Sequence, residues 1–310
     1  MANITLNNAN KAKNDEFYTQ IADVEKECKH YKEHFKGKTI FCNCDDPEQS
    51  AFWRYFHLNF ELLGVKKLIS THFVYKDLYQ AGDTYKMEYN GGADSDYTAG
   101  AKTTLKENGD FRSAECVELL KEADIVVTNP PFSLFREYVA QLMKYEKKFL
   151  IIGNKNALTY KEIFKFIKND EIWTGYRGFS GGMWFITQHE VATTKIVDDK
   201  KLANVPSIWF TNMDIAKRHE NLILYKTYTA REYPRYDNYD AINVDKTAEI
   251  PMDYDDIMGV PVTFLDKYNP DQFEIIGSMA STTIDEYSKG YPFIGGERKY
   301  ARILIKRKSV

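Results

Sequence analysis

The chain has 310 residues, of which 43% are hydrophobic and 15% aromatic, with 42 basic and 45 acidic side chains. This length allows one large or two medium domains, and the composition excludes an intrinsically disordered chain. The apolar runs are short and interrupted by charge, so we expect no membrane span. The chain begins without the apolar stretch of a secretory signal, which predicts a cytoplasmic protein.

The four cysteines, Cys28, Cys42, Cys44 and Cys116, are few and irregularly spaced for a chain of this length. This pattern predicts no disulfide framework. Cys42 and Cys44 form a C-x-C pair, but no second pair or histidine cluster at ligand spacing completes a zinc site. We therefore expect buried thiols in a strand and no metal.

The net charge of −3 is a sum over segments that differ strongly in charge. Residues 237–286 carry 2 basic and 12 acidic side chains, whereas residues 287–310 carry 7 basic and 1 acidic. The sum alone argues against a nucleic-acid partner, but such local concentration is typical of an electrostatic footprint for one. A solvated basic tail is an equally good interpretation of the last segment taken alone.

Short apolar strands alternate with amphipathic stretches of helical length in the first half of the chain. In chain order we predict a strand at 38–43, a helix at 50–64, a strand at 65–73, an excursion rich in Tyr, Gly and Asp at 76–101, a helix at 113–123, a strand at 124–129, a helix at 134–146 and a strand at 148–154. This alternation predicts an α/β fold with a parallel sheet covered on both faces.

Three of these strands end in polar residues: Asn43-Cys44-Asp45-Asp46 after the first, Asn129 at the end of the third, and Asn154-Lys155-Asn156 after the last. Because ligands of parallel sheets bind at the carboxyl ends of the strands, we expect these residues to form one site. Asp45 and Asp46 have an alternative interpretation as the N-terminal cap of the following helix.

The most informative motif is Asn129-Pro130-Pro131-Phe132. Two prolines cannot continue a central strand or a helix interior, so they fix a rigid extended turn that aims Asn129 outward. The side-chain carbonyl of Asn129 and the backbone carbonyl of Pro130 can then accept the two hydrogens of a planar amino group, while Phe132 stacks on its ring. Two such acceptors expose the nitrogen lone pair without a strong base, which indicates chemistry on an exocyclic amine of a purine.

The segment DIVVTNPPF resembles motif IV of the amino-methyltransferases that use S-adenosylmethionine, and Asn as its first polar residue matches the N6-adenine branch. Nearly the whole chain is similar to the EcoRI-type adenine-specific DNA methyltransferases, through residues 13–20, 39–56, 109–115, 129–139, 178–185 and 258–277. The resemblance implies a Rossmann-like methyltransferase sheet in a catalytic domain at 1–215. It also implies a smaller C-terminal target-recognition region at 216–310.

The resemblance further implies which residues bind the cofactor. Phe17-Tyr18-Thr19 resembles the N-terminal F-Y-T element, with Tyr18 and Thr19 as contacts of the methionine part. Asp110-Phe111 resembles the D-F pair, whose carboxylate accepts the amino group of the cofactor's adenine while the ring packs on its face.

The first loop departs from the family pattern. It contains Asn43, Asp45 and Asp46 but no glycine, although a glycine-rich loop is usual where backbone approaches the cofactor. All three residues are candidate cofactor contacts, and which of their atoms contact the cofactor is left open. The second strand ends without the acidic residue expected for the ribose, and Asp77 is a weak substitute.

Contacts with the DNA are predicted in two places. Phe179 and Trp184, in an aromatic segment with two adjacent glycines, are candidates for stacking on a flipped adenine. The last segment alternates as a strand, with Ile303 and Ile305 on one face, and supplies the candidate DNA-binding residues Arg298, Lys299, Arg302, Lys306, Arg307 and Lys308.

These features predict a site-specific DNA adenine N6-methyltransferase of a restriction-modification system, with S-adenosyl-L-methionine as cofactor and double-stranded DNA as substrate. A cognate restriction endonuclease would act on the same site without a stable complex, and a monomer is favoured. Three alternatives stay open: methylation of an RNA base or a protein amide by the same fold, N4-cytosine methylation, which Asn129 disfavours, and a binding module without turnover.

Overall fold

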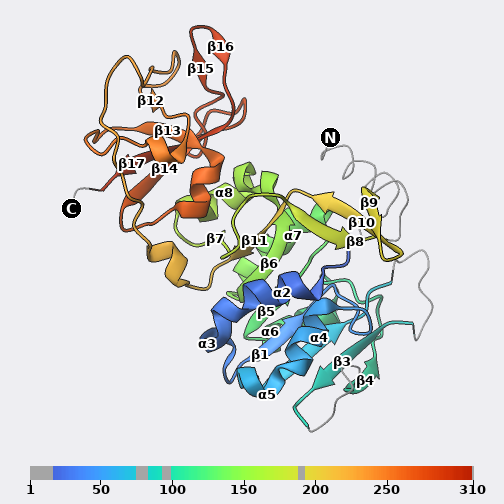
Figure 1. Cartoon of the computed structure of the whole chain (residues 1–310). Helices are drawn as coiled ribbons and strands as arrows, with labels where there is room; N and C mark the ends of the chain where they lie inside the picture. The colour runs from blue at the N-terminus through green and yellow to red at the C-terminus, as the bar shows by residue number, and fades with distance from the viewer. Residues whose placement is uncertain (1–16, 75–82, 93–98, 188–192, 309–310) are drawn as a thin grey trace. The chain divides into compact units, whose positions relative to one another are not determined.

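The computed structural model describes residues 17–74, 83–92, 99–187 and 193–308 (Figure 1). The chain forms two compact units, one of Met1–Lys155 with Gly175–Met213 and one of Asn156–Thr174 with Asp214–Val310. The boundary after residue 213 lies close to the expected one after 215. Residues 156–174 pack within the second unit, whereas the sequence analysis placed them in the first.

The large sheet of the first unit is mixed. Its parallel strands are β1 (Thr39–Cys42), β2 (Lys67–Thr71), β5 (Ile125–Thr128) and β6 (Lys148–Asn154), in the order β2-β1-β5-β6. The antiparallel strands β3 (Tyr85–Tyr89) and β4 (Ala101–Thr104) extend it beyond β2, and β11 (Ser207–Thr211) pairs antiparallel with β6. The predicted all-parallel sheet is therefore wrong at both of these edges.

Strand β3 lies in the segment that was predicted as an irregular excursion. Its residues Tyr85, Met87 and Tyr89 are buried and alternate with the less buried Lys86 and Glu88. This alternation is the ordinary pattern of a half-buried strand, but the surrounding Gly and Asp residues obscure it in the sequence.

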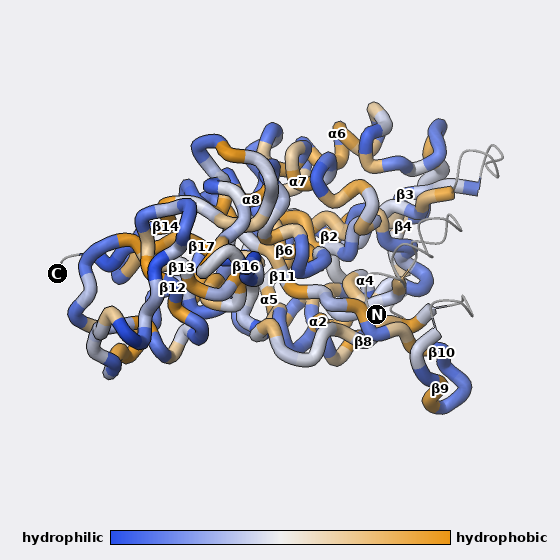
Figure 2. The backbone as a smooth tube through the Cα atoms, turned by 90° about the horizontal axis from the view of Figure 1, so that it is seen from above, coloured by the Kyte–Doolittle hydropathy of each residue, from blue (hydrophilic) through white to orange (hydrophobic). Residues whose placement is uncertain are grey.

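Helices cover both faces of this sheet. Figure 2 shows α6 (Ala114–Glu122) and α7 (Phe135–Lys144) on one side of β2 and β6, with α2 (Ile21–Cys28) and α4 (Ala51–Leu58) on the other. The first unit also contains two short helices, α3 (Lys32–Phe35) and α5 (Phe60–Leu63). No helix in the described ranges is both long and apolar enough to cross a membrane.

The predicted helix 50–64 is split by Asn59, whose Nδ2 donates to the carbonyl of Tyr55 at 2.8 Å. Such a local side-chain bond competes with regular helix geometry. The second part ends at Gly64, which adopts a left-handed conformation at φ 61°. At the other end, the Ser50 hydroxyl accepts from the amide of Trp53 at 2.9 Å, so Ser50, rather than Asp45 or Asp46, is the N-cap.

A smaller antiparallel sheet in the first unit has the order β8-β10-β9, with β8 (Met183–Ile186), β10 (Lys200–Val205) and β9 (Lys195–Val197). It is joined to the N-terminal segment, because the amide of Tyr18 donates to the carbonyl of Ile186 at 2.9 Å and the amide of Ile186 donates to the carbonyl of Tyr18 at the same distance. The Gln20 side chain adds a bond to the carbonyl of Trp184 at 2.6 Å.

The second unit has a four-stranded sheet in the order β12-β13-β17-β14. Its described elements are α8 (Lys161–Lys168), β7 (Trp173–Thr174), β12 (Ile242–Asn243), β13 (Met258–Pro261), β14 (Phe273–Met279), β15 (Phe293–Ile294), β16 (Glu297–Arg298) and β17 (Arg302–Arg307). Strand β17 is central, with β13 and β14 on its two sides.

The central position of β17 corrects the prediction for Arg302. Its side chain is buried, and its Nε donates to Asn243 Oδ1 at 3.1 Å while Nη2 lies 3.2 Å from Asp245. Ile303, Leu304 and Ile305 are also buried, so this half of the strand has no charged open face. Lys306 and Lys308 are exposed, as the DNA-binding hypothesis requires.

Candidate active site

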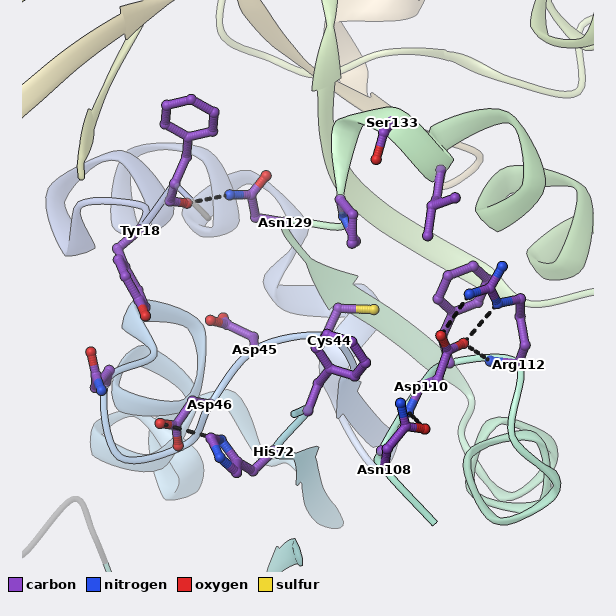
Figure 3. Close-up of a pocket in the computed structure, with 17 residues that line it drawn as sticks. Tyr18, Cys44, Asp45, Asp46, His72, Asn108, Asp110, Arg112, Asn129 and Ser133 are labelled. Atoms are coloured by element: carbon purple, nitrogen blue, oxygen red, sulfur yellow. Dashed lines mark hydrogen bonds and ion pairs between the residues drawn. The ribbon is translucent and has the colours of Figure 1, made fainter. Parts of the chain in front are cut away.

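A cavity of about 530 Å³ lies in the first unit, where β1, β2 and β5 end (Figure 3). This volume is in the range of sites for small ligands. Strand β1 pairs with β2 on one side and β5 on the other, so the chain order reverses here, and such switch points are where open α/β sheets bind ligands. The lining contains most of the predicted catalytic and cofactor-binding residues: Tyr18, Asp45, Asp46, Asp110, Phe111, Asn129 and Pro131.

Asn129 follows β5, and its amide is oriented by one strong hydrogen bond. Its Nδ2 donates to the backbone carbonyl of Phe17 at 2.6 Å, which assigns the donor and acceptor ends of the amide. Its Oδ1 is buried and accepts no hydrogen bond from any described residue. A buried acceptor without a donor is costly in a folded protein, and such groups are typical of a site that awaits a ligand.

The carbonyl of Phe17 is a functional group that the sequence analysis missed. The F-Y-T element was assigned to the cofactor only, yet its first residue holds Asn129, which is 112 positions away in the chain. No sequence motif predicts this contact, because any residue at position 17 has the same backbone carbonyl. The bridge between Tyr18 and β8 fixes this segment in place.

Three phenylalanines pack beside the Asn-Pro-Pro-Phe turn. The Phe132 ring lies 6.0 Å from Phe17 at an interplanar angle of 27° and 6.1 Å from Phe185 at 80°. Phe185 is fully buried. It was not predicted, although the alternation of Met183 and Phe185 with Trp184 along β8 indicates that Phe185 faces inward.

The two aromatic residues predicted to stack on the target base are not part of this group. Trp184 lies on the opposite face of β8 from Phe185, and Lys195 sits 3.9 Å above its ring. Phe179 is half-buried in the loop before β8. Neither residue lines the cavity, so their proposed stacking role rests on the sequence alone.

Asp110 and Phe111 occupy the loop that precedes α6, and both line the cavity. The Asp110 carboxylate receives a two-pronged contact from Arg112, with Nε 2.8 Å from Oδ1 and Nη2 2.7 Å from Oδ2. Burial opposes ionisation, but the Arg112 hydrogen bonds and charge hold the pKa of Asp110 below its usual value. Phe111 is 3% exposed and packs edge-on against Tyr138.

The first loop reaches a left-handed conformation without glycine. Cys44 has φ 63° and lines the cavity, so this residue occupies the conformation for which related loops use glycine. Asn43 is 1% exposed and does not line the cavity. Its Oδ1 instead accepts from Thr71 Oγ1 at 3.0 Å and its carbonyl accepts from Thr128, which joins the ends of β1, β2 and β5.

The neighbouring carboxylates differ in protonation. Burial raises the pKa of Asp45 to about 7, with Asp46 adding to the rise and a 2.5 Å hydrogen bond from Ser50 opposing it. Burial also disfavours ionisation of Asp46, but bonds from His72, the Glu48 amide and Tyr85 hold its pKa below the usual value. Asp46 therefore carries a fixed negative charge, and Asp45 can gain one near neutral pH.

Three further candidates that the structure describes, Thr19, Pro130 and Phe132, do not line the cavity. Thr19 is 8% exposed and does not line the cavity, and its Oγ1 is buried without a partner among the described residues. Pro130 is buried beneath the turn. Asp77 lies outside the described residues. No group of three metal-binding side chains occurs in the part of the chain that the structure describes.

The basic residues predicted to contact DNA belong to the second unit. Arg298 is exposed and stacks over Tyr291 with its guanidinium carbon 3.3 Å from the ring centre. Lys299 pairs with Glu297 at 2.8 Å. Arg307 donates to the carbonyl of Met252 and lies 3.5 Å from Asp255, so it is more engaged within the protein than its two lysine neighbours.

A mixed α/β sheet with an Asn-Pro-Pro-Phe turn beside a cavity at its switch point fits a methyltransferase fold. The family model described as the adenine-specific methyltransferase EcoRI matches residues 5–308. The chain belongs to this family.

Three relatives are similar to the chain over nearly their whole length. The chain is 46% identical to the type II methyltransferase M.EcoRI of Escherichia coli, covering 99% of this chain and 97% of the relative. It is 39% identical to the type II methyltransferase M.MgeORF184P of Mycoplasma genitalium, covering 98% and 99%, and 38% identical to M.MpnI of Mycoplasma pneumoniae, covering 98% of each. No solved structure matches the chain.

Proposed function

We propose that the chain is a site-specific DNA methyltransferase that transfers the methyl group of S-adenosylmethionine to N6 of an adenine flipped out of duplex DNA. The observation that carries this proposal is the buried Asn129 amide, oriented by the Phe17 carbonyl, whose Oδ1 lacks a donor beside a ligand-sized cavity. A flipped base brings an exocyclic amine, which supplies that donor.

The turn acts on the amine rather than on the methyl group. Asn129 Oδ1 accepts one amino hydrogen and the Pro130 carbonyl accepts the other, which draws the nitrogen toward tetrahedral geometry. Phe132 stacks on the purine, and Pro131 keeps the turn rigid. When bound, the cofactor would supply an electrophilic methyl group and would leave as the neutral thioether S-adenosylhomocysteine. The methylated nitrogen then carries one extra proton, which it releases to solvent water. Because the nitrogen lone pair is exposed by two hydrogen bonds before attack, the transfer needs neither a strong base nor a metal.

The cavity residues fit a cationic nucleoside cofactor. Asp45, Asp46 and Asp110 provide three carboxylates. The described lining contains one arginine, and that arginine is already paired with Asp110. Such a surface favours a ligand with positive charge. We assign Asp110 and Phe111 to the adenine end, Tyr18 to the methionine end, and Asp45 and Asp46 to the ribose and the charged centre, while Asn43 and Thr19 support the loop and strand.

We assign catalysis to the first unit, with its Rossmann-like parallel strands, and target recognition to the second. Within the second unit Arg298, Lys299, Lys306 and Lys308 remain candidates for phosphate contacts because their side chains are at least partly accessible. A monomer, a cytoplasmic location and a cognate endonuclease that acts on the same site complete the proposal.

The test is to incubate the full chain with S-adenosylmethionine carrying a labelled methyl group, together with duplex DNA, RNA and a protein mixture, and to separate the three pools. Label is expected in DNA, at a rate that falls about a hundredfold in Asn129→Ala because one transition-state hydrogen bond is lost. Label confined to RNA or protein would refute DNA as the substrate. Absence of label from every pool would favour a binding module.

A further inference from the structure

We propose that Arg112 is a positioning residue for cofactor binding: its guanidinium holds the Asp110 carboxylate so that a single acceptor site, on Oδ2, is left for the amino group of the cofactor's adenine. The inference rests on the proposed function in taking S-adenosylmethionine as the ligand. It goes beyond that function because neither the sequence motifs nor the resemblance assigns any role to Arg112.

The hydrogen bonds around Asp110 leave one position open. Oδ1 accepts from the Arg112 amide at 2.9 Å and from Arg112 Nε at 2.8 Å, and Oδ2 accepts from Arg112 Nη2 at 2.7 Å. Each carboxylate oxygen has about two acceptor sites. Among the described residues these three donors are the partners of the carboxylate, so Oδ2 retains one site, which matches one N–H of an exocyclic amine.

The guanidinium is itself held from a second side. Its Nη1 lies 3.3 Å from Oε2 of Glu137 on α7, and its central carbon lies 5.2 Å from the centre of the Phe111 ring. The backbone of the same loop is fixed by a 3.0 Å bond from Gln141 to the carbonyl of Phe111. A planar guanidinium with two parallel contacts sets the plane of the carboxylate, which a lysine ammonium cannot do. Figure 3 shows Arg112 and Asp110 joined beside the cavity.

Arg112 also keeps Asp110 in the form that accepts a hydrogen bond. Burial raises the pKa of Asp110, and the hydrogen bonds and charge of Arg112 outweigh it. Among the described groups, Glu137 lies beyond Arg112, and Asp45 lines the same cavity with a pKa that burial raises to about 7. The thiols of Cys44 and Cys116 have raised pKa values, so they stay neutral. Without Arg112, burial and the Glu137 charge act together, so the pKa of Asp110 moves upward.

The experiment measures binding of S-adenosylmethionine to the full chain by calorimetry, from about pH 5 to about pH 8. The variants are Arg112→Gln, Arg112→Lys and Asp110→Asn. Lys121→Gln is the matched control, because it removes one positive charge from an exposed position on α6 whose partner is Glu118.

We expect Arg112→Gln to bind about tenfold more weakly at pH 8, since the carboxylate is no longer held. Its affinity should fall further on acidification, at a higher pH than in the wild type. Arg112→Lys should recover the wild-type pH profile but not the full affinity. Asp110→Asn should retain only the pH dependence that Asp45, whose pKa burial raises to about 7, contributes, and Lys121→Gln should match the wild type.

Two results would overturn the inference. One is wild-type affinity and pH profile in Arg112→Gln. The other is a uniform loss of affinity with an unchanged pH profile, which is what a merely structural role produces. If the wild type itself fails to bind S-adenosylmethionine, the proposed function is refuted together with the inference. If the wild type binds and the Arg112 variants bind in the same way as the wild type, the inference is refuted and the proposed function stands.

Discussion

Asparagine at position 129 has a hydrogen-bond donor, Nδ2, that an aspartate would lack, and this donor makes a hydrogen bond in the structure. Nδ2 of Asn129 donates to the Phe17 carbonyl at 2.6 Å, and this bond fixes Oδ1 as the free acceptor that we propose for the substrate amine. On this proposal both the substrate and the N-terminal segment require an asparagine at position 129.

The substitution Asn129→Asp tests this account. It places a carboxylate oxygen where Nδ2 now meets the Phe17 carbonyl, and two acceptors at that distance repel each other. We expect methylation to fall at least about tenfold at about pH 8, because a buried hydrogen bond is lost. Protonation of the carboxyl restores a donor, so the variant's rate relative to wild type should rise as the pH falls. A ratio that does not change with pH would show that the Phe17 contact does not orient the side chain.

Sequence reasoning found Asn129 and Asp110 but not the groups that hold them. The Asn-Pro-Pro-Phe turn is visible because proline restricts the backbone whatever the surroundings are. The Phe17 carbonyl and the Arg112 side chain act through contacts that exist only in the folded chain, and no motif assigns these contacts to them. At Cys44 the sequence pattern was misleading in another way. The family pattern predicts a glycine in this loop, but Cys44 adopts the left-handed conformation instead.

The loop between β4 and α6 places Asp110 and Arg112, and it approaches the end of β2 closely. Gly109 has φ 76°, and a Cβ there would lie 2.3 Å from the carbonyl oxygen of His72. Beside it, the Val74 amide donates to the Asn108 carbonyl at 3.0 Å, and Asn108 Nδ2 donates to the Val74 carbonyl at 3.2 Å. A side chain at position 109 would therefore displace the loop that carries the cofactor-binding residues.

We expect Gly109→Ala to lower both stability and cofactor affinity. The matched control is Gly37→Ala, because Gly37 has a similar φ of 70° but nothing within 4 Å of the added Cβ. The control should cost only left-handed strain, roughly 1 to 2 kcal/mol of unfolding free energy. Gly109→Ala should cost more than about 3 kcal/mol, since a backbone clash is added. Urea unfolding of both variants measures this, and equal losses would refute the close approach.

The elements were predicted to different degrees for physical reasons. Strand β6 has the predicted limits, 148–154, because a continuous apolar run marks a strand buried on both faces. Strand β3, which pairs with β2, was missed because the surrounding Gly and Asp residues obscure its alternation, and β4 was missed because it is defined by its pairing with β3. In β17 the alternation suggested an open charged face, but its central place in the sheet buries Arg302 against Asn243.

At the scale of the whole chain, the uneven charge has a partly structural explanation. The acidic stretch 237–286 and the basic end belong to the same unit, and they pair: Arg302 with Asp245 at 3.2 Å and Arg307 with Asp255 at 3.5 Å. The end of the chain is therefore a strand whose arginines have acidic partners, not a free basic tail. The exposed Lys306 and Lys308 remain as the accessible charge of that strand.

The two units divide most of the predicted contacts between them. The predicted cofactor-binding and amine-binding residues belong to the first unit, together with the stacking candidates Phe179 and Trp184, whereas the basic candidate DNA contacts belong to the second. The central claim is that the Asn129 turn of the first unit methylates N6 of adenine in DNA. This claim concerns one atom of one base and can be tested at that atom.

The most direct measurement is mass spectrometry of nucleosides from duplex DNA incubated with S-adenosylmethionine and either the wild type or Asn129→Ala. The account predicts N6-methyladenine as the modified nucleoside with the wild type. It predicts about a hundredfold less with the variant at equal time and with cofactor binding retained. N4-methylcytosine in place of N6-methyladenine, or N6-methyladenine formed by Asn129→Ala at the wild-type rate, would contradict it.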